Sequence, residues 1–275
     1  MFYDTSSFRQ PLEGTRDDRT HAIVVLAPSE SKRLIAKAVL KLPEVRRALD
    51  DGLFIVSRGI TPSFIVEELG VEGLDRPHCT SGVVTDRRLG GTVRQMGPWV
   101  FRQGKLVQEE AYDVLQEFKS TDVSIKGANA VDIEGNAGIL VGNEAGGTIG
   151  SIWPTLTARG SYLIIPVGLE KLIPSVIDAA MRCGTRLFKY AMGSFVGLNP
   201  VVNALVVTEV EAIEVLAGVT ATHVSSGGVG GSEGAVILAL EGDDNAVLTA
   251  FEIVESIKGE PATAMPEIEP AIRAR

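Results

Sequence analysis

The sequence predicts an α/β fold with a mainly parallel sheet flanked by helices, followed by a small α+β domain. Apolar strand patterns and amphipathic helix patterns alternate over residues 21–184, which is typical of a parallel sheet. Glycine-rich turns follow several of these strands. After residue 198 the order changes to β-α-β-β-α. We therefore expect an α/β domain over residues 1–198, an α+β domain over 199–262 and a tail over 263–275.

The first third of the chain contains one candidate ligand element. Residues 1–20 show no period, and we expect an arm that packs late or on a partner. An apolar strand over residues 21–27 precedes a helix with apolar residues on one face. A second strand, residues 53–57, runs directly into Arg58, Gly59 and Thr61 and then a helix. A Gly and a Thr at the exit of a strand, with Pro in the first helical turn, predict a junction that accepts an anion.

The elements that follow complete the predicted α/β domain. Residues 77–107 are expected to be β-rich, with a hairpin that turns at Gln103-Gly104. The patterns then predict helices over residues 109–119, 151–159 and 172–182, and strands over 123–125, 137–141 and 162–167.

The segment over residues 124–150 is the one around which we expect the site to be organised. A short strand enters a turn at Gly127, and a second strand leads into a loop that contains Gly146, Gly147 and Thr148. Helix-start geometry there predicts an anion site made of backbone N–H groups. We expect this loop and the Arg58–Thr61 junction to meet at one edge of the parallel sheet, with a pocket between them.

The C-terminal region predicts a ferredoxin-like unit. Strands over residues 203–208, 220–225 and 235–240 alternate with helices over 209–217 and 243–257, which is most of a split βαβ arrangement. Such a half-sized sheet leaves an edge and an apolar face that a second copy could cover, so we expect a homo-oligomer. Residues 261–275 are expected to form a poorly ordered tail.

Composition excludes several classes of protein. The 275 residues carry a formal net charge of −9 and scattered Lys and Arg, which disfavours binding to nucleic acid or an anionic membrane. The apolar runs are too short to cross a bilayer. The two cysteines fit no metal-binding spacing, and they favour a reducing, cytoplasmic environment. The sequence indicates no metal site and identifies no cofactor.

Two separated segments resemble the NagB/RpiA/CoA-transferase-like superfamily. They are DGLFIVSRGITPSFIVEEL and IKGANAVDIEGNAGILVGNEAGGTIG, and the resemblance covers residues 21–184. It implies a strand exit that holds phosphate, and a sugar-phosphate isomerase-like or acyl-CoA-dependent activity. Superfamily isomerases place a catalytic Asp where this chain has Asn129. Because an amide cannot abstract a proton from carbon, the usual base is missing.

The candidate site residues follow from these two segments. Asp132 and Glu144 are the nearest acids and are the candidate catalytic residues. Lys126 is either a point charge for phosphate or a solvated lysine at a strand end. Asn129 either orients a ligand hydroxyl or satisfies the backbone of a turn. The full set of candidate ligand-binding residues is Arg58, Gly59, Thr61, Lys126, Gly127, Asn129, Gly146, Gly147 and Thr148.

Three functions agree with these observations. The first is an enzyme that acts on a small anionic metabolite, either phosphorylated or acyl-CoA-like. The second is a non-catalytic metabolite sensor that assembles through its C-terminal domain, which the missing aspartate at position 129 favours. The third is a purely structural subunit that binds no ligand.

Overall fold

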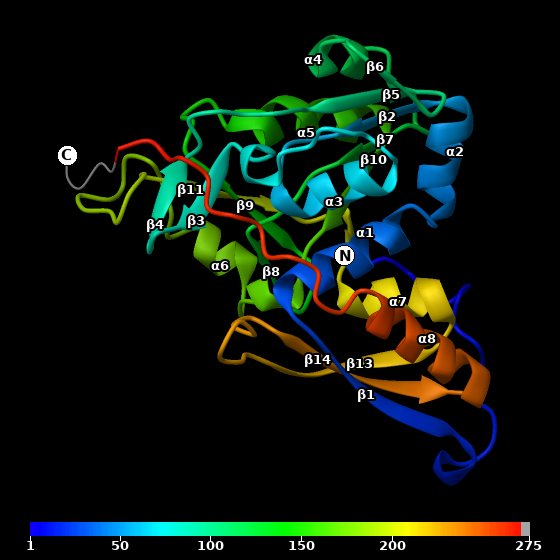
Figure 1. The fold of residues 1–275 in the computed structure, drawn as a ribbon. Helices are drawn as coiled ribbons and strands as arrows, with labels where there is room; N and C mark the ends of the chain where they lie inside the picture. Colours follow the sequence, from blue (N-terminus) through cyan, green and yellow to red (C-terminus); the bar gives the residue numbers. More distant parts are fainter. Residues whose placement is uncertain (271–275) are drawn as a thin grey trace.

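The computed structural model describes residues 1–270, and its centre is a six-stranded mixed sheet. The strands are β2 (Leu53–Val56), β5 (Trp99–Arg102), β6 (Lys105–Val107), β7 (Val123–Ile125), β10 (Tyr162–Pro166) and β12 (Leu205–Val207). They lie in the order β12-β10-β7-β2-β5-β6. Figure 1 labels all of these strands except β12. The first four run parallel, whereas β5 and β6 form an antiparallel hairpin at one edge. Helices flank the sheet, which confirms a mixed α/β fold.

The middle strands are buried on both faces, which explains their continuous apolar sequences. Along β2, Phe54 and Val56 belong to one hydrophobic cluster, and Leu53 and Ile55 belong to a second cluster on the opposite face. Strands covered on both faces read as apolar runs without alternation. This is the pattern that the sequence predicted for the parallel strands.

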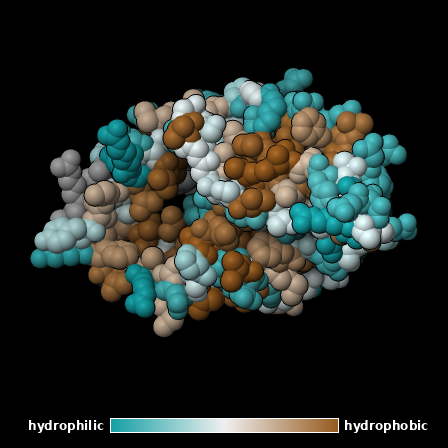
Figure 2. Space-filling view, turned by 90° about the horizontal axis from the view of Figure 1, so that it is seen from below, coloured by the Kyte–Doolittle hydropathy of each residue, from teal (hydrophilic) through white to brown (hydrophobic). Residues whose placement is uncertain are grey.

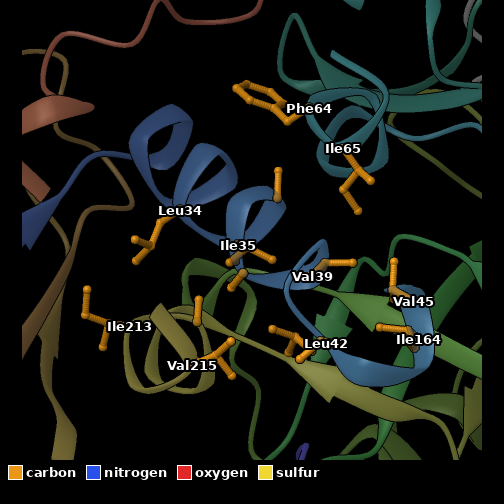
Figure 3. Close-up of a cluster of buried hydrophobic side chains, with 14 of the residues drawn as sticks. Leu34, Ile35, Val39, Leu42, Val45, Phe64, Ile65, Ile164, Ile213 and Val215 are labelled. Carbon is orange, nitrogen blue, oxygen red and sulfur yellow. The ribbon is translucent and has the colours of Figure 1, made fainter. Parts of the chain in front are cut away.

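Four helices cover the first face of the sheet. They are α1 (Pro28–Val39), α2 (Pro43–Asp51), α3 (Ile60–Glu68) and α7 (Glu209–Ala217). Leu34, Ile35 and Val39 of α1 lie between Phe64 of α3 and Ile213 of α7 (Figure 3). This packing fixes the starts of α1, α3 and α7 near the carboxyl ends of the parallel strands.

The second face carries α4 (Ala111–Leu115), α5 (Gly147–Arg159) and a small antiparallel sheet. That sheet has the order β11-β9-β8 and contains β8 (Ala130–Val131), β9 (Ala137–Val141) and β11 (Gly197–Val201). The prediction that β9 belongs to the parallel sheet is wrong. The turn between β8 and β9 is only five residues long, and parallel neighbours need a crossover of a dozen residues or more.

The remaining three-stranded sheet combines the two ends of the chain. It pairs β1 (Thr20–Leu26) with β14 (Val236–Gly242), and β14 with β13 (Thr220–Ser226). Helices α7 and α8 (Asp244–Ser256) lie between this sheet and the rest of the molecule (Figure 1). This corrects the expected division at residues 198 and 199, because β12 joins the large sheet and β1 joins the small one. The four strands needed for a complete ferredoxin-like unit are not all in this sheet.

The ends and short elements also differ from expectation. Residues 1–5 pack on their own chain, where Tyr3 N donates to Val206 O at 2.8 Å. The described part of the tail is ordered against β4 (Arg88–Gly91), which forms a hairpin with β3 (Gly82–Thr85). Glu269 N donates to Gly91 O there. Residues 271–275 lie outside the described part of the chain.

Two predicted helices are shorter than expected. Helix α6 (Val176–Ala180) begins late because residues 172 and 173 pair with Val131, and Ser175 then caps the helix. Helix α4 ends early because residues 116–122 form turns, in which Asp122 accepts the N–H of Lys119 at 2.6 Å. Within residues 1–270, no helix has the length and apolar character needed to cross a membrane.

Candidate functional site

Polar side chains follow each of the four parallel strands. Arg58 follows β2, Lys126 follows β7, Lys171 lies in the turn after β10, and Glu209 begins α7 directly after β12. The carboxyl ends of parallel strands meet at one edge of a sheet, where ligands of α/β proteins commonly bind. The candidate functional site is therefore this carboxyl edge.

Lys126 and Lys171, which we call the lysine pair, lie close together at the centre of this edge. Lys126 Nζ donates to Gly127 O at 3.3 Å, and Lys171 Nζ donates to Ala128 O at 3.1 Å. These carbonyls belong to consecutive residues. Among residues 1–270, neither lysine forms an ion pair with a carboxylate. The pair is thus held by neutral acceptors.

Burial lowers the pKa of both members of the lysine pair. For Lys126, burial and then the positive charge of Lys171 lower the pKa from 10.5 to about 8. For Lys171, burial and then the charge of Lys32 lower the pKa to about 8, against the opposing charges of Glu170 and Glu209. Both side chains remain partly exposed. A ligand with negative charge would relieve the repulsion.

Lys32 and Glu170 form an ion pair beside the lysine pair. Lys32 Nζ lies 2.8 Å from Glu170 Oε1 and donates to Pro28 O at 2.9 Å, at the start of α1. In this contact the carboxylate of Glu170 balances the positive charge of Lys32. A Cβ added to Gly234, in the loop between β13 and β14, would lie 3.1 Å from Glu170 Oε2. The glycine-rich loop over residues 227–234 therefore borders the site.

Glu209 is a buried carboxyl group next to the lysine pair. It is 0% exposed, and its Oε2 accepts the N–H of Leu169 at 2.8 Å. Its Oε1 has no hydrogen-bond partner within residues 1–270 and lies 3.0 Å from where a Cβ on Gly168 would be. Burial raises the pKa of Glu209. Ser31 Oγ is near enough to oppose this shift, yet it makes no well-formed hydrogen bond.

The junction after β2 is built mainly for packing. A Cβ on Gly59 would lie 2.9 Å from Pro62 Cδ, and one on Gly127 would lie 3.1 Å from the same atom. Gly59 N already donates to Cys79 O, and Thr61 is 3% exposed. The two glycines thus allow α3 to approach β7. Within residues 1–270, the buried Nε of Arg58 has no hydrogen-bond partner.

The second predicted element begins a helix on the other face of the sheet from α3. Thr148 is exposed in the first turn of α5, which packs on the second face of the sheet, whereas α3 packs on the first face. Gly146 and Gly147 have φ values of 90° and 58°, so the loop requires glycine there. Neither of two surface hollows among residues 1–270 is lined by Thr61 or Thr148.

The two predicted catalytic acids have other partners. Asp132 is 2% exposed and accepts hydrogen bonds from Glu134 N, Asn136 N, Asn136 Nδ2 and Val176 N. Burial alone raises its pKa, but these donors outweigh burial and hold the pKa below its usual value. Glu144 is exposed and pairs with Arg186 at 2.6 Å. Neither lies among the groups at the carboxyl edge.

Asn129 agrees with the backbone interpretation of that position. Its Oδ1 accepts the N–H of Leu140 at 3.0 Å, and its own N–H donates to Gly138 O at 2.8 Å. The side chain therefore closes the start of the β8–β9 hairpin. In the described residues, no cluster of three or more His, Cys, Asp or Glu side chains could hold a metal ion.

A surface hollow of about 310 Å³ lies elsewhere, between the β3–β4 hairpin and residues 188–196. Its walls are mostly apolar, and they include none of the groups at the carboxyl edge. One of its lining residues, Arg88, also has a buried Nε without a hydrogen-bond partner in the described residues. We assign the site to the lysine pair because two lysines with lowered pKa values and the buried Oε1 of Glu209 lie together there.

The comparisons with known proteins identify no relative. No family model matches the chain, no curated protein matches it, and no solved structure matches it.

Proposed function

We propose that this protein binds a small anionic metabolite, either phosphorylated or acyl-CoA-like, at the lysine pair. The observation that carries the proposal is the contact of Lys126 and Lys171 with consecutive carbonyls, without a carboxylate partner in the described chain. Two cations that form no ion pair within residues 1–270 are suited to a doubly charged anion. Arg58, with its unpaired Nε, extends the same edge.

Electrostatics support this assignment. A bound anion would restore the pKa of each lysine toward 10.5, and each unit of that shift corresponds to about 1.4 kcal/mol of interaction. The contribution of the pair to binding is thus on the order of a few kcal/mol. The overall charge of −9 disfavours large polyanions but leaves such a local site intact.

The resemblance to the NagB/RpiA/CoA-transferase-like superfamily remains a proposal for the finer fold. The parallel strands and the glycine turn at Gly127 support it. The C-terminal unit resembles a ferredoxin-like unit in having α7 and α8 on one face of an antiparallel sheet. An isomerase-like reaction is our first candidate, but its acids would not be Asp132 and Glu144, whose oxygens already have partners.

A metabolite sensor is the alternative, and two measurements separate it from an enzyme. Thermal-shift screening against sugar phosphates, nucleotides and acyl-CoAs identifies a ligand. Hydrogen exchange between that ligand and ²H₂O then reports proton abstraction. Binding with exchange or turnover supports an enzyme. Binding without either supports the sensor.

Substitution tests the location of the site. We expect Lys126→Met and Lys171→Met to abolish the thermal shift that the ligand causes, because each removes one cation. Lys105→Met is the matched control, since Lys105 is an exposed lysine at the edge of the same sheet. If all three variants respond to ligand like the wild type, the lysine pair is not the site.

The outer face of the small sheet supports the proposal of a homo-oligomer. Ile23 and Val25 of β1 are 64% and 45% exposed, and Val224 of β13 is 56% exposed. Figure 2 shows apolar surface on this underside of the molecule. We propose that a second copy covers this face. Light scattering should give the mass of an oligomer for the wild type and of a monomer for Ile23→Lys. A monomeric wild type would contradict the proposal.

A further inference from the structure

We propose that the lysine pair is a carbonyl-reactive site, in which Lys171 Nζ forms an imine with an aldehyde or ketone of an anionic metabolite. Lys126 would hold the anionic group of the same molecule. The proposal rests on the proposed function and extends it to a substrate class, the phosphorylated or carboxylated carbonyl compounds.

The surroundings of Lys171 favour a neutral amine. Its Nζ donates to the carbonyl of Ala128 and makes no ion pair within the described chain. The charged groups that face it are Lys126, Lys32, Glu170 and Glu209. Glu170 is already paired with Lys32 at 2.8 Å. A lysine beside another cation in a partly desolvated site loses its proton more easily and becomes a nucleophile.

Glu209 provides the group that imine formation needs for proton transfer. Its Oε2 is fixed by the N–H of Leu169, which belongs to the same short turn as Lys171. Its Oε1 is buried and without a hydrogen-bond partner among residues 1–270. Burial favours the protonated carboxyl group, which can donate to a departing oxygen.

The reaction needs no oxidant or reductant. The lone pair of neutral Lys171 Nζ forms a C–N bond with the carbonyl carbon, and the C=O π pair moves to oxygen, which takes the proton released by nitrogen. The carbinolamine then loses its hydroxyl as water, with the proton supplied by Glu209, and the nitrogen lone pair forms the C=N bond. The products are a protonated imine and one water, with the Glu209 carboxylate left behind.

Reductive trapping tests this proposal. The full-length protein is incubated with glyceraldehyde 3-phosphate and sodium cyanoborohydride, and the modified lysines are located by peptide mass spectrometry. We expect Lys171 to be labelled at least ten-fold faster than Lys105, with the rate rising as the pH passes about 8. Inorganic phosphate should slow the labelling of Lys171 and of Lys126, and leave the labelling of Lys105 unchanged. Equal labelling of Lys171 and Lys105 would overturn the proposal.

Two variants separate this proposal from simple anion binding. Lys171→Arg keeps a cation but removes the nucleophile, so we expect the fast phase of labelling of the whole protein to vanish while Lys105 is labelled at its wild-type rate. The thermal shift with inorganic phosphate then reports separately how much anion binding the arginine retains. Glu209→Gln should keep the phosphate shift and slow the labelling of Lys171. If phosphate binds the wild type but Lys171 is not trapped, the carbonyl chemistry fails and the proposed function stands. If phosphate neither shifts the melting temperature nor protects any lysine, both fail.

Discussion

At the scale of residues, burial makes the two lysines of the candidate site oppose folding, and we propose that they bind an anion. Each is partly buried, hydrogen-bonded to a neutral carbonyl and close to a like charge. Buried charges of this kind lower stability, and functional sites often carry such a cost. The site should therefore be a local source of instability in the free protein.

We predict that Lys126→Met raises the free energy of unfolding at pH 7 by about 1 to 3 kcal/mol, because it removes a charge that burial disfavours. The pKa of Lys126 is about 8 in the folded protein and near 10.5 in the unfolded chain. Between these values the unfolded chain binds more protons, so the wild type gains stability as the pH rises.

Urea denaturation at pH 7 and pH 10 checks this prediction, with Lys105→Met as the control. The difference in free energy of unfolding between Lys126→Met and the wild type should be smaller at pH 10 than at pH 7. If Lys126→Met were no more stable than the wild type at pH 7, or if its stability relative to the wild type grew with pH, the lowered pKa of Lys126 would be contradicted.

Asp132 provides a contrasting prediction at the same scale. Its carboxylate accepts four hydrogen bonds that hold the β8–β9 turn against α6. Asp132→Asn should lower the free energy of unfolding by about 1 to 3 kcal/mol, because it removes the charge and an acceptor. Phosphate binding should be unchanged. Asp178→Asn, at an exposed position on α6, is the control. If Asp132→Asn lost phosphate binding but kept its stability, Asp132 would have to be part of the binding site.

At the scale of elements, an ionic network joins α1, α3 and the segment after α8. Arg33 contacts Glu67, Glu68 and Glu260 at 2.7 to 2.9 Å, and Arg76 contacts Glu67 and Glu260. Both guanidinium groups also lie over the ring of Phe64. The network fixes the start of the C-terminal segment against the helices that support the site.

We predict that Glu260→Gln destabilises the fold by about 1 to 3 kcal/mol at pH 7, with Glu252→Gln on the exposed face of α8 as the control. Burial alone raises the pKa of Glu260, but Arg33 and Arg76 lower it below 4.5 overall. This stabilisation is therefore present above pH 4.5 and is lost as the pH falls through the folded pKa. In thermal melts from pH 7 to pH 3, the melting temperatures of the wild type and of Glu260→Gln should converge. A constant difference would contradict the network.

The elements also show which parts of the site could be predicted. The sequence predicts Lys126 as a candidate because it adjoins a glycine turn directly after an apolar strand. Lys171 and Glu209 also follow a strand within a few residues, but Lys171 is preceded by only the single Gly168 and no glycine adjoins Glu209. Their proximity depends on β10 lying between β7 and β12, and that order follows from packing rather than from local sequence. The sequence also predicts an anion site at the loop with Gly146, Gly147 and Thr148, because glycines at the start of a helix are a strong local signal.

At the scale of the whole molecule, the chain ends tie the two sheets together. Strand β1 comes from the N-terminal region and forms seven residue pairs with β14. Strand β12 belongs to the large sheet but leads directly into α7. The alternating exposure along β1, with Val24 and Leu26 inside and Ile23 and Val25 outside, is typical of a half-buried antiparallel strand. Its apolar sequence resembles a central parallel strand, which explains the misplaced domain boundary.

We predict that residues 199–275 do not fold alone, because the small sheet would keep only the β13–β14 hairpin and β12 would lose its neighbour. Circular dichroism and proton NMR of this fragment should show no cooperative unfolding. Addition of a peptide with residues 16–27 should not restore cooperative unfolding, because β12 would still lack its neighbouring strand. A fragment with a cooperative melt and dispersed amide signals would contradict this account.

The proposed site depends on the charge state of the lysine pair and on the change in the two pKa values when an anion binds. The direct measurement is NMR titration of protein labelled with ¹³C at lysine Cε, with Lys126→Arg and Lys171→Arg used to assign the two signals. We predict that both lysines titrate near pH 8 in the free protein and that inorganic phosphate moves both pKa values toward 10.5. Titration of both lysines near 10.5, unchanged by phosphate, would contradict the account.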